Sequence, residues 1–166
     1  MIETRVTPFY NENRRGKLTL GKEEADMALL MNDTDMKQML DAICPEGETY
    51  QGQAWGTLMS GTAEMLALGA LSNVYCYVGV TERFLVIAVL ETLDISHIYG
   101  KICIPFDQFD EVKIKKGLVP SQRIIKMKSG KTKLKLSLVN NSITAKVKEQ
   151  KLGMQKICEA LEKAAR

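Results

Sequence analysis

The clearest fold signal in the chain is residues 123–138, RIIKMKSGKTKLKLSL. Two runs in which apolar and basic residues alternate flank Ser129-Gly130-Lys131, a composition typical of a hairpin turn. Successive side chains of a strand point to opposite faces of a sheet, so one set can be buried while the other faces water. The stretch therefore predicts an antiparallel hairpin that buries Ile125, Met127, Leu134 and Leu136 and exposes Lys126, Lys128, Lys133 and Lys135.

The sequence on both sides of this hairpin predicts a mainly β (α+β) fold. Short runs rich in β-branched and aromatic residues predict strands over residues 50–59, 74–80, 83–91, 96–104 and 111–115. Residues 106–109 follow a proline and predict a turn or a single helical coil. Residues 148–165 predict an amphipathic helix with an apolar stripe of Leu152, Ile157 and Leu161. About seven strands followed by one helix indicate a bent antiparallel sheet or partly open barrel, capped by that helix.

The N-terminal region differs from the rest of the chain. Residues 1–20 are polar and irregular, and we interpret them as a loose arm. Residues 22–43 have helical periodicity, but residues 32–35 interrupt it. Either one helix runs through, or a second helix begins with Asp33 or Thr34 as its N-cap. We expect an N-terminal arm and helix over residues 1–43 and a β domain over residues 44–166.

Composition and charge indicate one globular domain with a polarised surface. The 166 residues are 45% hydrophobic and 26% charged, which is close to the globular average. No apolar run approaches the ~20 residues of a membrane span, and the N-terminus lacks the apolar region of a secretory signal, so we expect a cytoplasmic protein. Residues 1–109 carry a net charge of −7 and residues 110–166 a net charge of +10. This asymmetry predicts one basic face.

Several segments share their order and spacing with a known family. Residues 77–87, YVGVTERFLVI, resemble the "yl.lTd.RLlv" strand pair of bacterial pleckstrin-homology-like (PH-like) domains. Residues 104–112, IPFDQFDEV, are similar to the family's "ipy.qI..V" segment. Residues 116–118 and 125–131 resemble its turn and "I.t.sGk" hairpin, and residues 44–48, CPEGE, its "l.pgE" segment. The resemblance covers about residues 44–165 and implies a binding or assembly module rather than a reaction.

Residues that could carry catalysis or hold a cofactor are missing from the sequence. His97 is the single histidine, and the sequence shows no partners for it at the spacing of a known triad or of a histidine-based metal site. Neither glycine-rich phosphate-loop pattern occurs. Paired carboxylates such as Asp107 and Asp110 are typical of turns and helix starts. The four cysteines lie far apart in sequence, which favours small buried side chains in a reducing compartment: Cys44, Cys76, Cys103 and Cys158. We therefore predict no enzyme, no metal and no cofactor.

The hairpin lysines form the first candidate surface. Lys126, Lys128, Lys133 and Lys135 should share one sheet face, with Lys113, Lys115 and Arg123 nearby. Such a face fits an anionic partner, but lysines on a soluble sheet also discourage aggregation through its edge, and both interpretations stay open. The hairpin has no aromatic residues, which argues against nucleic acid.

The apolar segment 60–72 is the second candidate surface. It caps the core, inserts into a membrane, or forms an exposed interface through Met65, Leu66, Leu68 and Leu71. Methionines in residues 22–43 add adaptable apolar surface: Met27, Met31, Met36 and Met39. We expect a non-enzymatic binding or assembly module that forms a homo-oligomer through residues 22–43 or 60–72, or binds a protein partner. The alternative is a peripheral membrane module that binds anionic lipid through the lysine-rich face.

Overall fold

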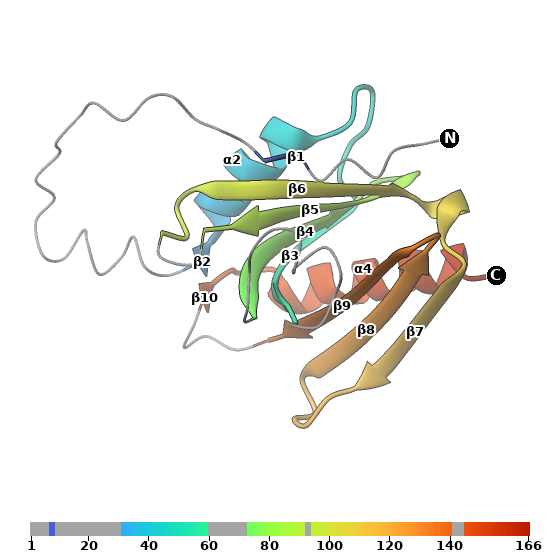
Figure 1. The fold of residues 1–166 in the computed structure, drawn as a ribbon. Helices are drawn as coiled ribbons and strands as arrows, with labels where there is room; N and C mark the ends of the chain where they lie inside the picture. The colour runs from blue at the N-terminus through green and yellow to red at the C-terminus, as the bar shows by residue number, and fades with distance from the viewer. Residues whose placement is uncertain (1–6, 9–30, 60–72, 92–93, 141–144) are drawn as a thin grey trace, which may run out of the picture.

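The computed structural model of the chain describes residues 7–8, 31–59, 73–91, 94–140 and 145–166 (Figure 1). Its helical elements are α2 (Asp33–Ile43), a short 3-10 turn η1 (Phe106–Gln108) and α4 (Gln150–Ala164). The long strands are β3 (Gly52–Leu58), β4 (Val74–Val80), β5 (Phe84–Leu90), β6 (Ile98–Pro105), β7 (Glu111–Lys116), β8 (Gln122–Ser129) and β9 (Thr132–Val139). Three two-residue strands are β1 (Thr7–Pro8), β2 (Met31–Asn32) and β10 (Ala145–Lys146). The expected mainly β fold with a C-terminal helix is confirmed.

One antiparallel sheet holds the seven long strands in the order β6-β5-β4-β3-β9-β8-β7, with β1 beside β6. The sheet is bent but does not close into a barrel, since β7 and β1 stand at opposite ends of this order. Strand β3 pairs along its whole length with β4 but shares only two residue pairs with β9. The bend therefore falls between β3 and β9, and it separates a half built from β3–β6 from a half built from β7–β9.

The predicted alternation in the C-terminal strands is confirmed. Ile125, Met127, Leu134 and Leu136 are all buried in the main core. They lie in register with Val112 and Ile114 of β7, which pack against the same core. The inner face of these strands is thus a continuous apolar layer under α4.

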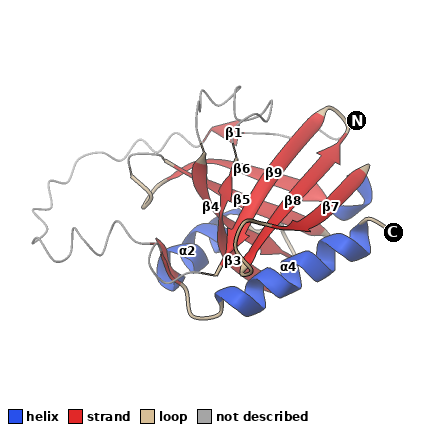
Figure 2. Cartoon of the chain, turned by 90° about the horizontal axis from the view of Figure 1, so that it is seen from below, coloured by secondary structure: helices blue, strands red, loops and turns tan. Residues whose placement is uncertain are grey.

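Helix α4 begins near β3 and runs toward β7, as Figure 2 shows. Its approach to β3 is very close, because a Cβ on Gly153 would lie 1.8 Å from the carbonyl oxygen of Gln53. Only a glycine therefore fits at that position of the helix. The buried Gln150 also joins helix to sheet: its side chain accepts a hydrogen bond from Trp55 N at 3.0 Å and donates to Trp55 O at 2.8 Å and Val139 O at 3.1 Å.

The predicted apolar stripe of α4 needs one correction. Ile157 and Leu161 are fully buried, as expected, but Leu152 is 45% exposed. Gly153 and Met154 occupy the buried positions at this end of the helix instead. The close contact through Gly153 turns the first part of α4 so that Leu152 points away from the sheet.

Helix α2 covers the outer face of the β3–β6 half. The helix begins at Asp33, and its N-cap is Asn32, whose side chain accepts a hydrogen bond from Asp35 N. The sequence predicted Asp33 or Thr34 as the N-cap, so the observed N-cap lies immediately before these two residues. A second core forms here, separate from the one under α4, and includes Met31, Met36, Met39 and Leu40 against Trp55, Tyr77, Val86, Ala88 and Leu90. The three methionines are therefore buried against the chain's own sheet. Met27 and the segment 60–72 lie outside the described residues.

Three further features of the described residues are the turn after Pro105, the cysteines and the hydropathy of the helices. The predicted single coil after Pro105 is η1. All four cysteines are free thiols, of which Cys76 is buried and the other three are half-buried. Over the ranges that the structure describes, no helix has the length and apolar character to cross a bilayer.

Candidate functional site

The outer face of β7, β8 and β9 carries a set of lysines that we call the lysine face. Helix α2 packs on β3, β4 and β5, and thus on the other half of the sheet. The side chains on β7–β9 that alternate with the buried layer lie on the face away from α4, where most of them are exposed or half-buried, although Ser137 is buried. The lysine face consists of Lys113, Lys115, Lys126, Lys128, Lys133 and Lys135.

Strand register places lysines directly opposite one another. Lys126 of β8 faces Lys113 of β7 on one side and Lys135 of β9 on the other. Lys128 similarly faces Lys133, with Glu111 on its other side. Like charges directly opposite in a sheet destabilise it. The strands therefore hold two lysine rows in an arrangement that costs folding free energy.

Glu111 is the single carboxylate on the described outer face of these three strands. Its side chain forms an ion pair with Lys113 of the same strand. Hydrogen bonding and attraction by Lys113 lower the pKa of Glu111, and the charges of Lys128 and Lys133 act in the same direction. Glu111 stays ionised but balances only one of the six lysines, so the face keeps a strong positive charge.

The predicted site residues are found largely where the alternation placed them. Lys126, Lys128 and Lys133 are exposed, and Lys135 is half-buried. Arg123 was expected near these lysines, but it lies on the opposite face of the sheet. Its Nη1 donates to the backbone carbonyls of Pro120 and Gln122. The second candidate surface, Met65, Leu66, Leu68 and Leu71, lies outside the described residues.

Sequence reasoning treated Lys113 and Lys115 as neighbours of the site, whereas they are full members of it. The signal was present in residues 111–116, EVKIKK, whose alternation matches that of the hairpin. Which lysine faces which could not be found this way, because alternation assigns a face but not a register.

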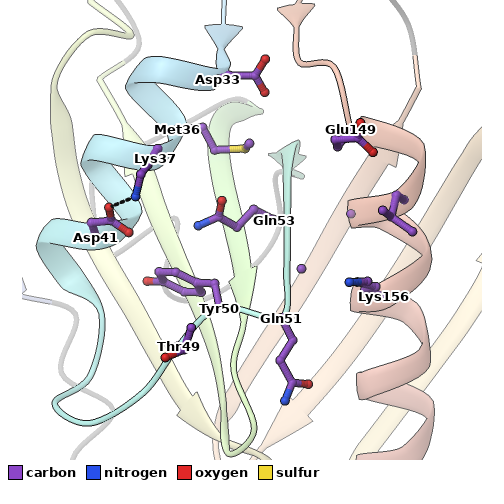
Figure 3. A pocket seen from close by; sticks show the side chains of 13 residues that line it. Asp33, Met36, Lys37, Asp41, Thr49, Tyr50, Gln51, Gln53, Glu149 and Lys156 are labelled. Atoms are coloured by element: carbon purple, nitrogen blue, oxygen red, sulfur yellow. Dashed lines mark hydrogen bonds and ion pairs between the residues drawn. The ribbon is translucent and has the colours of Figure 1, made fainter.

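A cleft of about 510 Å³ lies between α2 and α4, with residues 49–53 as its floor (Figure 3). Four of its polar side chains, Asp33, Lys37, Asp41 and Tyr50, have partners within the chain. Lys37 forms an ion pair with Asp41 at 2.5 Å, and Asp33 accepts a hydrogen bond from Lys148 N at 3.2 Å. Tyr50 donates to the carbonyl oxygen of Leu40 at 2.6 Å. Burial raises the pKa of Tyr50 above its usual range, so its phenol remains a donor and supports the wall of the cleft.

A histidine, a serine and a carboxylate lie together in one surface turn of the described residues. His97 is largely exposed, and its Nδ1 lies 2.8 Å from Asp94 within a surface turn. Ser96 Oγ donates to the same carboxylate and lies 3.1 Å from the same ring nitrogen of His97, so the three side chains close the turn. No group of three or more metal-ligating side chains occurs in the part of the chain that the structure describes. The lysine face is therefore the stronger candidate site.

Comparison with known proteins finds solved structures of weak similarity. The sequence matches no family model and no curated protein. A similar solved structure is the C-terminal domain of an unknown protein from Leishmania infantum, with a TM-score of 0.46, 11% identity, and coverage of 76% of this chain and 94% of that chain. Another is the hSac2 domain of the human phosphoinositide phosphatase Sac2, with a TM-score of 0.47, 10% identity, and coverage of 88% and 84%. At these values we take nothing about function from either structure.

Proposed function

We propose that this protein is a non-enzymatic, cytoplasmic binding module of the bacterial PH-like type, and that the lysine face contacts an anionic partner. The observation that carries this proposal is the in-register row of Lys113, Lys126 and Lys135. Like-charged side chains set opposite each other lower stability, and a solubilising surface would serve as well with mixed charges. A partner that supplies negative charge removes the repulsion and makes the row favourable.

The overall charge distribution supports the same proposal. Residues 110–166 hold 15 Lys and Arg against 5 Asp and Glu, whereas residues 1–109 hold 8 against 15. The acidic part includes the α2 side of the molecule, where Asp33, Asp35 and Asp41 lie. A molecule polarised in this way turns its lysine face toward an anionic partner during approach.

The test is retention of purified protein on an immobilised sulfated polysaccharide, eluted with a salt gradient. One variant replaces Lys126, Lys128, Lys133 and Lys135 with Gln. The matched control replaces four exposed lysines outside the face with Gln, and so removes the same charge: Lys146, Lys151, Lys156 and Lys163. We expect the first variant to elute at much lower salt than the control. Lysines clustered on one face bind a polyanion more tightly than the same number of scattered lysines.

Equal retention of the two variants would contradict the proposal, because only net charge would then matter. The thermal midpoint of the control should stay close to that of the parent protein, since exposed lysines contribute little to stability. The midpoint of the lysine-face variant should equal or slightly exceed that of the parent, because its substitutions remove like-charged cross-strand pairs. A large loss of stability in the lysine-face variant would assign these lysines a structural role instead.

Self-association stays a prediction, and the structure removes part of the sequence evidence for it. Three of the four methionines that supported it are buried against the chain's own sheet. Met27 and the segment 60–72, which both lie outside the described residues, remain as its basis. Light scattering at micromolar concentration tests it, and a species of 18.6 kDa would contradict it.

A further inference from the structure

The turn that joins β7 to β8 presents large apolar side chains to solvent. Leu118 is 101% exposed and Val119 is 46% exposed. Among the described residues no other large hydrophobic side chain is as exposed as Leu118; the next after these two, Leu152, reaches 45%. Figure 1 shows that the β7–β8 hairpin extends beyond the rest of the sheet. We call residues 117–121 the apolar tip.

The apolar tip is a built turn rather than a loose loop. The Gln122 side chain reaches across it, accepting from Leu118 N at 2.9 Å and donating to Ser137 Oγ at 2.8 Å. The backbone adds bonds from Gly117 N to Gln122 O and from Gln122 N to Val119 O, each 3.0 Å long. A Cβ on Gly117 would lie 2.1 Å from Gln122 Oε1, so a larger residue there would push the Gln122 side chain out of this position.

Much of the polar backbone of the tip is therefore satisfied within the protein. Arg123 Nη1 donates to the carbonyl oxygen of Pro120 at 2.9 Å, and Pro120 itself has no N–H group. Unsatisfied backbone groups are what make irregular backbone costly in an apolar phase. This turn can leave water at a lower cost than an open loop of the same length.

Basic residues surround the tip. Lys115 and Lys116 end β7 immediately before it, and Lys116 lies opposite Arg123, the second residue of β8. The lysine face continues from there along the outer side of the same strands, through Lys113 and Lys126. An apolar tip flanked by basic residues is complementary to a partner that has negative charge at its surface and an apolar layer beneath it.

We infer that the partner of the lysine face is the surface of an anionic lipid bilayer, with Leu118 and Val119 inserted at the boundary between headgroups and acyl chains. This inference rests on the proposed function and names its partner. Lysines near an anionic bilayer contribute attraction that decays within a Debye length, and the apolar tip contributes burial that salt does not screen. A soluble polyanion offers the electrostatic attraction but no apolar layer for the tip. Binding to a polyanion can therefore be distinguished from binding to a bilayer.

The experiment measures co-sedimentation of the protein with two kinds of vesicle, one of phosphatidylcholine and one of equal parts phosphatidylcholine and phosphatidylserine. The parent protein should bind the anionic vesicles and ignore the neutral ones. Replacing both Leu118 and Val119 with Ser should lower the partition coefficient roughly tenfold, since two partly buried aliphatic side chains are lost. Retention of this variant on the sulfated polysaccharide should equal that of the parent.

Leu152→Ser is the matched control, because Leu152 is also exposed but lies on α4 away from the tip. It should leave vesicle binding unchanged. In a Leu118→Trp variant, the fluorescence emission should shift to the blue on anionic vesicles, against the constant background of the buried Trp55.

The outcomes separate this inference from the proposed function. If the parent protein is retained by the polysaccharide through its lysine face but ignores anionic vesicles, the partner is a soluble polyanion or protein, and the bilayer inference is wrong. Vesicle binding by the double-serine variant at the level of the parent would also overturn insertion of the tip. If the polysaccharide does not distinguish the lysine-face variant from its control, the proposed function itself fails.

Discussion

Replacing Lys126 with Glu should make the protein more stable and a weaker binder at the same time. Lys126 stands at the centre of a row, between Lys113 and Lys135. The substitution turns two like-charged cross-strand pairs into two opposite-charged pairs. Each favourable pair contributes roughly 0.2–1 kcal/mol, and exposure to solvent favours the lower part of that range, so we expect a gain of about 1 kcal/mol in the free energy of unfolding.

Urea denaturation at low ionic strength is the suitable assay, because guanidinium is itself a salt and would screen the effect. For a chain of this size, the gain corresponds to a rise of roughly 2–4 °C in the thermal midpoint. Lys126→Gln should fall between the parent and the Glu variant, because it removes repulsion without adding attraction. At about 1 M salt, where the Debye length is about 3 Å, the gain should shrink toward zero.

Lys101→Glu is the matched control for this prediction. Lys101 also lies on a strand, but it pairs with Ala88 and Thr7 rather than with lysine. The Lys101→Glu variant should have nearly the stability of the parent. Retention on the polysaccharide should fall more for Lys126→Glu than for Lys101→Glu. The reasoning is refuted if Lys126→Glu is less stable than the parent at low salt, or if Lys101→Glu gains as much.

Three further predictions concern the core. Gly153→Ala should cost about 3 kcal/mol or more in chemical denaturation, because its Cβ would meet the backbone oxygen of Gln53, which cannot move aside freely; a neutral result would mean that α4 shifts easily on the sheet. Leu161→Asp should cost several kcal/mol while Leu152→Asp costs little, since the first is fully buried and the second is 45% exposed; equal thermal midpoints for the two would contradict the packing of α4. Burial raises the pKa of Tyr77 to about 12 from an ordinary value of 10.0, so the unfolded chain releases this proton first. The free energy of unfolding should therefore fall as pH rises from about 10 toward 12, and a denaturation series in Tyr77→Phe should show a shallower fall.

The local elements of this fold could be predicted because each depends on a short period in the sequence. Alternation within residues 123–138 assigned Ile125, Met127, Leu134 and Leu136 to the buried face and the four hairpin lysines to the outer face, as the structure has them, whereas Arg123 lies on the inner face. The strand over residues 74–80 matched its observed bounds, and the strands on either side of it differed by a few residues at their ends. Periodicity is a property of neighbouring residues, so it is readable without knowledge of the partner strand.

The burial of side chains on the two helices could not be predicted from local periodicity. Helical spacing placed Leu152 on the buried side of α4, but the close contact between Gly153 and β3 turned it outward. The methionines of α2 suggested an unburied surface, but they meet a second apolar face of the sheet. In both cases the outcome depended on a contact between residues about 20 to 100 positions apart, which no local pattern contains.

The sequence by itself determined that this protein has a β-rich fold, a basic C-terminal part and lysines gathered on one face of a hairpin, because composition and period two are sufficient for each of these. Only the tertiary structure decided that Lys113, Lys126 and Lys135 stand in one row, since strand register is set by long-range pairing. The same holds for the apolar tip. Its turn residues were readable in the chain, but the exposure of Leu118 and the closure by Gln122 depend on how far the hairpin extends beyond the sheet.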